Sequence, residues 1–262
     1  MNYPTDLDSL AITLDTERRT ATITLDDPEK HNRVSMLARD QLSELFRLVG
    51  NDEMVDVVFL KGAGDRAFTA GGDIPGFLRA TPEELTRLHD NVAGPERCPK
   101  PVIALIQGYC LGVGLELSLA CDFRIATDDA QIGLPEIRIG MMPGSGGTQR
   151  LTRLIGLGRA KDMIMRGRRI SADEALSYGL VTEVVEPGGL VAAGQRLAAE
   201  LQQHSPLAMA MVKRVLNRAY ETPLGAGLEL EGLAYGFLRT THDFREGVES
   251  FVEGRPPEYT GE

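Results

Sequence analysis

Two glutamates stand in surroundings that change what a carboxyl group can do. Glu116 lies in the apolar run LGVGLELSLA, and Glu136 follows a proline in GLPEIRIG. A carboxylate among leucines is costly unless it is paired or protonated, so Glu116 is a candidate acid or base. It also fits the first turn of a helix, where the helix dipole stabilises a carboxylate that reaches solvent. Glu136 by itself is typical of a turn or a helix start.

Two glycine-rich segments each follow an apolar run of the kind that forms a buried strand. AFTAGGD spans 67–73 and GYCLGVG spans 108–114. Glycine lets the backbone approach a ligand closely, and the second segment opens a helix whose first amides have no partner. Two such loops side by side could direct two amide N–H groups at one oxygen and form an oxyanion hole. Glycine content alone favours tight turns without a ligand.

Paired carboxylates and converging amides together fit one chemistry especially well. One carboxylate holds and deprotonates a water molecule while the other delivers a proton. The amides would polarise a carbonyl group that gains negative charge, such as that of a thioester. The four features therefore predict acid–base chemistry on an activated acyl group.

Signals for several other chemistries are missing. Neither glycine-rich segment carries the GK[ST] of a phosphate-binding loop, and GVG at 112–114 lacks the third glycine of a dinucleotide fingerprint. Ser145 is not in a GxSxG elbow because Pro143 occupies the first glycine position, which disfavours a serine hydrolase. The three cysteines form no CxxC pair and the four histidines are scattered singly, so we expect reduced thiols and no metal site.

The charge balance limits the partners of the chain. The 262 residues carry a formal net charge of -10, which argues against a general binder of nucleic acid or of anionic membranes. No apolar run approaches the roughly 20 residues of a membrane span. The start, MNYPTDLDSL, has no apolar core of a secretory signal, so we expect a cytoplasmic protein.

Hydrophobic periodicity predicts an α/β protein with parallel strands and a helical tail. Short apolar runs that recur with intervening helices predict strands at 11–15, 20–25, 56–62, 101–108, 121–126 and 180–185. Helical spacing predicts helices at 36–49, 82–92, 114–120, 146–155 and 158–166, and a short one that Ser171 caps and that ends at Gly179. From Pro187 onward the pattern is helical, with breaks at Pro206, Pro223 and about Thr241. We divide the chain into an α/β core with the active site, 1–200, and a helical region, 201–262.

The chain resembles the enoyl-CoA hydratase/isomerase (crotonase) superfamily from about residue 10 to its end. The most specific block is IALIQGYCLGVGLELSLACDFRIATDDAQIGLPEIRIGMMPGSGGTQRL, 103–151. Further agreement lies in AFTAGGDI at 67–74, GRRISADEALSYGLVTEVV at 167–185 and DFREGVESFVEGRPPEY at 243–259. The resemblance implies a crotonase-like spiral of ββα units with a C-terminal helical trimerisation region.

The resemblance also implies roles for individual residues. Glu116 and Glu136 match the hydratase carboxylates, and the oxyanion donors would be the backbone N–H groups of Gly72 and Val113. Gly144 matches the glycine whose backbone helps to hold the water. Further substrate-binding positions are Ala70, Asp73 and Ile74. No metal and no cofactor are implied, because the coenzyme A moiety belongs to the substrate.

The chain departs from the family pattern in three places. Val113 stands where hydratases often have glycine, so the loop must accept a β-branched residue although its N–H group is kept. Pro75 and Gly76 replace the usual polar pair after the first loop, and Gly254 stands where a lysine is common near the coenzyme A phosphates. Contacts to the coenzyme A or acyl part of the substrate are expected to differ there.

The expected reaction is reversible syn addition of water to a trans-2-enoyl-CoA, which gives a 3-hydroxyacyl-CoA. The alternatives are another crotonase-family reaction on an acyl-CoA (isomerase, hydrolase or lyase) and a non-catalytic or RNA-binding member, which the charge disfavours. Expected partners are an acyl-CoA substrate and further copies of the chain, with no nucleic acid and no membrane. One domain can hardly bury all the apolar residues of the tail, so we expect a homotrimer or homohexamer; these residues are Leu228, Leu230, Leu233, Tyr235, Phe237 and Leu238.

Overall fold

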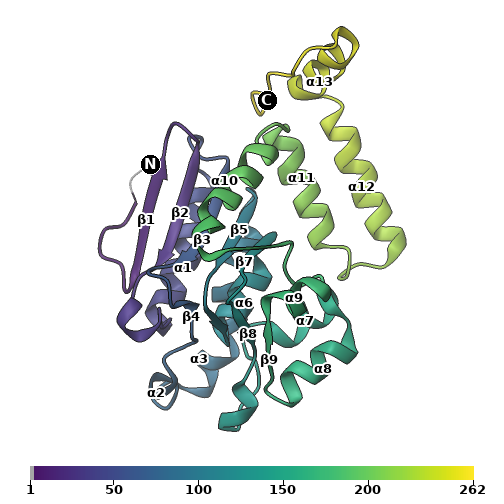
Figure 1. The fold of residues 1–262 in the computed structure, drawn as a ribbon. Helices are drawn as coiled ribbons and strands as arrows, with labels where there is room; N and C mark the ends of the chain where they lie inside the picture. The colour runs from purple at the N-terminus through teal and green to yellow at the C-terminus, as the bar shows by residue number, and fades with distance from the viewer. Residues whose placement is uncertain (1–2) are drawn as a thin grey trace.

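Two β-sheets lie at the centre of the computed structural model, which describes residues 3–262 (Figure 1). The larger sheet has the strand order β1-β2-β3-β5-β7-β10, and only the pairing of β1 with β2 is antiparallel. Its strands are β1 (Leu10–Asp15), β2 (Thr20–Leu25), β3 (Val57–Gly62), β5 (Val102–Ile106), β7 (Phe123–Thr127) and β10 (Glu183–Val185). The expected α/β class with parallel strands is confirmed.

The second sheet consists of three-residue strands that periodicity did not predict. Its order is β4-β6-β8-β9, and the first three strands are parallel. The strands are β4 (Ala67–Thr69), β6 (Tyr109–Leu111), β8 (Gln131–Gly133) and β9 (Arg169–Ser171). Segments this short carry too few residues for an alternating pattern, and β4 and β6 lie in the glycine-rich segments 67–73 and 108–114, which are expected to be loops.

The chain moves between the two sheets as it advances. β3, β5 and β7 lie in the large sheet, and the strands that follow them, β4, β6 and β8, lie in the small one. Gly108 makes the bend between β5 and β6 with φ +54, and a Cβ there would lie 2.1 Å from the carbonyl oxygen of Arg66. Only glycine fits such a backbone approach. Each turn of the spiral thus contributes one strand to each sheet.

Both faces of the large sheet are buried, which explains the continuous apolar runs of β3 and β5. Val58, Leu60 and Ala104 belong to the main core, while Phe59 and Leu105 point to the other face. Helix α10 (Leu190–Leu201) covers that second face, and a Cβ on its Gly194 would lie 2.8 Å from Leu105.

Helices on the main-core side carry the expected apolar faces. α1 (Met36–Gly50) buries Leu42, Leu45 and Phe46, and α6 (Val113–Ala120) is buried along its whole length. The helix expected at 82–92 is two short helices, because the backbone at Arg87 has φ -101 and ψ 4. The other short elements of this part are η1 (Pro28–Lys30), α2 (Ile74–Phe77), α3 (Pro82–Thr86), α4 (Leu88–Val92), α5 (Gly94–Arg97), η2 (Glu136–Ile139), α7 (Gly147–Ile155), α8 (Leu157–Met165), α9 (Ala172–Ser177) and η3 (Pro187–Gly189).

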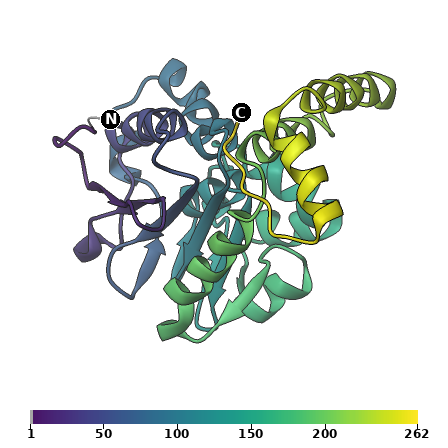
Figure 2. The same cartoon turned by 90° about the horizontal axis from the view of Figure 1, so that it is seen from above.

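The last three helices lie to one side of the sheets. α11 (Pro206–Asn217) runs beside the core, whereas α12 (Leu224–Leu238) and α13 (His242–Glu253) extend away from it (Figure 1). The final residues then turn back from the end of α13 (Figure 2). Asp243 is buried and accepts hydrogen bonds from the amides of Thr260 and Gly261 and from the Ser205 hydroxyl, so it ties the tail to the start of α11.

A buried lysine joins α11 to the core. Lys213 is 8% exposed, and its ammonium donates to Asp122 Oδ2 at 2.6 Å and to the carbonyl oxygens of Pro95 and Lys100 at 2.8 and 2.9 Å. Burial raises the pKa of Asp122, and the neighbouring ammonium opposes that rise. All three hydrogens of the ammonium therefore have acceptors in the core.

Replacing this lysine should destabilise the fold. Lys213→Met leaves the Asp122 carboxylate without its counter-charge, and we expect a loss of about 3 kcal/mol in the free energy of unfolding. Arg196→Met is the matched control because the Arg196–Glu183 pair is exposed, and it should cost less than about 1 kcal/mol. Urea-induced unfolding followed by circular dichroism measures both. Equal losses would show that Lys213 does not hold α11 in place.

Candidate functional site

Three of the predicted site segments follow neighbouring parallel strands. Gly72 comes after β4, Val113 after β6 and Glu136 after β8, and these strands pair in that order. The carboxyl ends of parallel strands meet at one edge of a sheet, which is where open α/β sheets bind ligands. The small sheet therefore brings residues from positions 72, 113 and 136 to one place.

The two glycine-rich loops are in contact. A Cβ on Gly112 would lie 3.9 Å from the Cα atom of Gly71, and one on Gly71 would lie 3.6 Å from the Leu111 carbonyl oxygen. Gly71 has φ +126 and Gly112 has φ +56, so both positions favour glycine. The tight turns that glycine content favoured are present, and they are side by side.

Two amide groups of these loops have no acceptor within the part of the chain that the structure describes. Gly72 forms an isolated β-bridge with Val34, but the hydrogen bonds of that bridge use Gly71 and Asp73 and not the N–H group of Gly72. Val113 is the first residue of α6. A helix leaves its first amides unpaired and carries partial positive charge at that end. Val113 accepts the helical backbone although it is β-branched, and its side chain is buried at 4% exposure. The backbone hydrogen bonds of the described chain therefore leave both amides unused.

Glu116 lies one turn along the same helix and is fully enclosed. Its exposure is 2%, so the alternative of a carboxylate that reaches solvent is wrong. Its Oε1 atom accepts hydrogen bonds from the amides of Ser145 at 2.7 Å and of Gly147 at 2.9 Å. Both amides belong to the turn before α7, which holds the carboxylate in place. Two hydrogen bonds from fixed backbone donors therefore orient the Glu116 carboxyl group.

Glu136 is half-buried and lacks such donors. It begins the 3-10 helix η2 after Pro135, and its Oε2 atom is buried without a hydrogen-bond partner among the described residues. Burial, together with the charge of Glu116, raises the pKa of Glu136 to about 7. Its Oε1 atom faces the second loop, because a Cβ on Gly112 would lie 3.2 Å from it. The two carboxyl groups thus have opposite environments.

An arginine also lies at this site, and the motifs had not indicated it. Arg39 of α1 is 2% exposed, and its Nη1 atom donates to the hydroxyl of Ser145 at 2.8 Å. Its Nη2 atom lies 3.1 Å from the position that a Cβ on Gly72 would take. A charged residue on the apolar face of a predicted helix was the available signal. Ser145 itself was considered only as a nucleophile, whereas here it joins Arg39 to Glu116.

The remaining predicted residues lie around the first loop and the turn before α7. Ala70 is exposed, and its amide donates to the carbonyl of His31 at 2.9 Å. Asp73 precedes α2 and forms an ion pair with Arg33 at 3.1 Å, and Ile74 is 53% exposed. Gly144 is exposed beside Ser145, and a Cβ there would lie 3.7 Å from Leu88.

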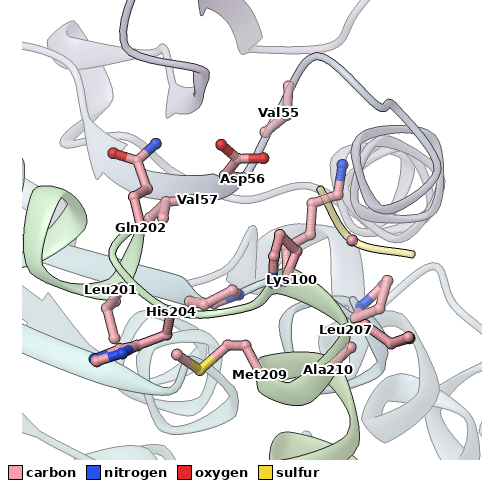
Figure 3. Close-up of a pocket in the computed structure, with 14 residues that line it drawn as sticks. Val55, Asp56, Val57, Lys100, Leu201, Gln202, His204, Leu207, Met209 and Ala210 are labelled. Carbon is pink, nitrogen blue, oxygen red and sulfur yellow. The ribbon is translucent and has the colours of Figure 1, made fainter. Parts of the chain in front are cut away.

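A hollow of about 240 Å³ lies elsewhere in the molecule (Figure 3). Asp56 and Lys100 line it on one side, and Leu201 and His204 line it on the other. It adjoins the amino ends of β3 and β5, whereas ligand sites of parallel sheets form at the carboxyl ends. Within residues 3–262, no group of three or more His, Cys, Asp or Glu side chains could hold a metal ion, and no helix is long and apolar enough to cross a membrane.

Comparison with known proteins gives one family over almost the whole chain. Residues 15–262 match the family model described as enoyl-CoA hydratase/isomerase. The chain belongs to the enoyl-CoA hydratase/isomerase family. The crotonase-like fold is thereby confirmed, and members of this family act on acyl-CoA substrates.

Individual members of the family are similar over nearly their full length. YngF of Bacillus subtilis, provisionally named an enoyl-CoA hydratase/isomerase, is 40% identical over 97% of this chain and 99% of its own. The short-chain-enoyl-CoA hydratase of Clostridium acetobutylicum is 35% identical over 93% and 95%. The crystal structure of an enoyl-CoA hydratase from Bacillus anthracis has a TM-score of 0.91 at 37% identity, covering 97% of this chain and 100% of that one.

The environment of Glu136 should be visible by infrared spectroscopy. Because its pKa is raised to about 7, the protein should show a carboxylic acid C=O band that disappears as the pH rises through neutrality. Glu136→Gln should remove that band, and Glu83→Gln, at an exposed position, should not. An unchanged band in Glu136→Gln would contradict the assignment.

Proposed function

We propose that this chain is an enoyl-CoA hydratase that adds water syn to a trans-2-enoyl-CoA and gives a 3-hydroxyacyl-CoA. The observation that carries the proposal is the contrast between its two carboxyl groups. Glu116 accepts two amide hydrogen bonds, whereas burial raises the pKa of Glu136 to about 7. A pair whose environments differ in this way suits one base and one acid.

The proposed steps assign one proton movement to each carboxyl group. Glu116 acts as the base that takes a proton from the attacking water, with the backbone near Gly144 helping to hold that water. Oxygen then bonds to C3, and the electrons of the double bond move toward the thioester carbonyl. Glu136 acts as the acid that donates its proton to C2. The two carboxyl groups lie close enough for their charges to interact, and in the proposed reaction both act on the same face of the substrate, which gives syn addition.

The amides of Gly72 and Val113 would stabilise the carbonyl oxygen during this reaction. That oxygen gains enolate character when water attacks C3, and preformed backbone donors then act without reorganisation. Their lack of acceptors within the described chain and the contact of their loops support this role. Ala70, Asp73 and Ile74 lie beside the first loop and would contact the coenzyme A part of the substrate.

The similar proteins act on different acyl groups, so they do not indicate which acyl group the substrate of this chain carries. At similar identity the family includes a (E)-benzylidenesuccinyl-CoA hydratase of Thauera aromatica and a 2,3-dehydroadipyl-CoA hydratase of Escherichia coli. A panel of enoyl-CoA thioesters from C4 to aromatic, with products identified by mass spectrometry, tests the reaction and the substrate together. Isomerised, hydrolysed or cleaved products without a hydroxyacyl-CoA would replace hydration by another reaction of the family.

Removal of either proton-transferring group should abolish most of the activity. Glu116→Gln and Glu136→Gln keep the shape of the side chain but cannot exchange a proton as glutamate does. We expect each to lower kcat for hydration by at least ~10²-fold, with little change in the affinity for an acyl-CoA ester. Loss of the thioester's conjugated absorbance measures the rate. Near-wild-type kcat in either variant would remove that glutamate from the mechanism.

The donor at Val113 should depend on its backbone and not on its side chain. Val113→Gly keeps the amide N–H group and should retain activity. Val113→Pro lacks it and should lose activity by about 10²-fold or more, the scale for one oxyanion donor. Circular dichroism and thermal unfolding check the fold of both variants. A folded, fully active Val113→Pro protein would contradict the oxyanion-hole assignment.

We also propose that the chain forms a homotrimer or homohexamer. Large apolar side chains of α12 remain exposed, with Leu233 at 74%, Tyr235 at 73% and Leu228 at 56%. The helix projects from the core, so a second subunit could cover several of its faces (Figure 2). Light scattering at micromolar concentration should give three or six times the mass of one chain. A monomer would overturn this proposal.

A further inference from the structure

Arg39 is an exception on the apolar face of its helix. The helix packs against the core through apolar side chains, among them Ala38, Leu42, Leu45 and Phe46. Arg39 lies among these residues and is 2% exposed. A fully buried charge is rare in proteins unless it is paired, because its desolvation is costly. Burial accordingly lowers the pKa of the Arg39 guanidinium, while the charges of Glu116, Asp40 and Glu136 oppose that change. An arginine nevertheless stays protonated in proteins.

The carboxylates whose charges act on the guanidinium do not contact it directly within the described chain. Nη1 donates to the neutral hydroxyl of Ser145, and Nε is buried with no acceptor. No carboxylate forms an ion pair with Arg39 among residues 3–262. Its other close neighbour is the ring of Phe77, whose centroid lies 5.7 Å from Cζ. The cost of burying this cation is therefore only partly offset in the free protein.

The guanidinium of Arg39 lies close to the first loop, where its positive charge could offset a negative charge on a ligand. Nη2 lies 3.1 Å from the place of a Cβ on Gly72, directly behind the first loop of the proposed oxyanion hole. On its other side, Ser145 accepts from Nη1 and donates its amide to Glu116. The cation thus lies between the Ser145 turn that holds Glu116 and the backbone of Gly72.

We propose that Arg39 is a positioning residue whose positive charge stabilises the enolate-like oxygen from behind Gly72. This rests on the proposed hole at Gly72 and Val113. A further negative charge appears near the guanidinium when the thioester oxygen becomes negative. Interactions that strengthen only as charge develops lower the barrier instead of tightening substrate binding. The guanidinium need not touch the substrate, because a buried charge is screened less by water than an exposed one.

A bound enolate provides a direct test that needs no hydration. Acetoacetyl-CoA loses its C2 proton to solvent, and the resulting enolate is seen by its ultraviolet absorbance. Butyryl-CoA is the neutral probe, because it has no double bond to hydrate and no acidic ketone. We compare wild type, Arg39→Met and Arg39→Lys, with Arg47→Met as the matched control on the exposed side of the same helix.

Arg39→Met should raise the apparent pKa of bound acetoacetyl-CoA and weaken enolate binding by about tenfold or more, equal to one pKa unit. Butyryl-CoA affinity should change by less than about twofold, and Arg39→Lys should restore part of the enolate binding because it keeps the charge. Arg47→Met should match wild type. In hydration, Arg39→Met should lower kcat with little change in KM.

Three results would overturn the proposal. The first is an unchanged enolate fraction in a folded Arg39→Met protein. The second is an equal loss of affinity for both probes, which would assign Arg39 to packing alone. The third is a loss of affinity confined to acyl-CoA esters whose acyl group carries a carboxylate, which would show that Arg39 recognises that carboxylate. If Arg39→Met does not fold, Arg39→Gln is the neutral variant to measure. A wild type that binds the enolate but hydrates no enoyl-CoA would overturn the proposed function alone.

Discussion

The parallel pairing of three short strands is the constraint on which the site depends. β4, β6 and β8 contribute only three residues each, yet their pairing places the segments that follow them at one edge. The hydrogen bonds of so small a sheet could not hold it alone, because isolated short strands are marginal in water. The large sheet supplies the missing stability, since each short strand follows a buried strand of the core.

Polarity is concentrated at this edge of an otherwise apolar interior. Glu116 and Arg39 are both 2% exposed and are joined through Ser145 without forming an ion pair. Glu136 stands nearer to solvent, and its Oε2 atom has no hydrogen-bond partner within residues 3–262. Glu116, Glu136 and Arg39 have different local environments: two backbone amides donate to Glu116, burial raises the pKa of Glu136, and the Ser145 hydroxyl accepts from Arg39. Replacing one of them changes the electrostatic balance for the other two.

The long strands and helices and the two glutamates could be predicted from the sequence, and the reasons are physical. Buried strands such as β3 and β5 are apolar over their full length, and α1 repeats its leucines at helical spacing. Glu116 stood out because a carboxylate among leucines is costly. The small sheet was missed because its strands are set by long-range pairing and not by local pattern. Arg39 was missed because its importance arises only when position 39 meets position 145 in space.

The stereochemistry of hydration in D2O tests the central claim most directly. If Glu116 and Glu136 act on one face of the substrate, crotonyl-CoA should give 3-hydroxybutyryl-CoA with the C2 deuteron and the C3 hydroxyl added to the same face. Proton NMR coupling constants distinguish that product from the other diastereomer. A single syn product from the wild type, absent with either glutamine variant, is the predicted result. Anti addition, a mixture of diastereomers or no hydration by the wild type would contradict the account.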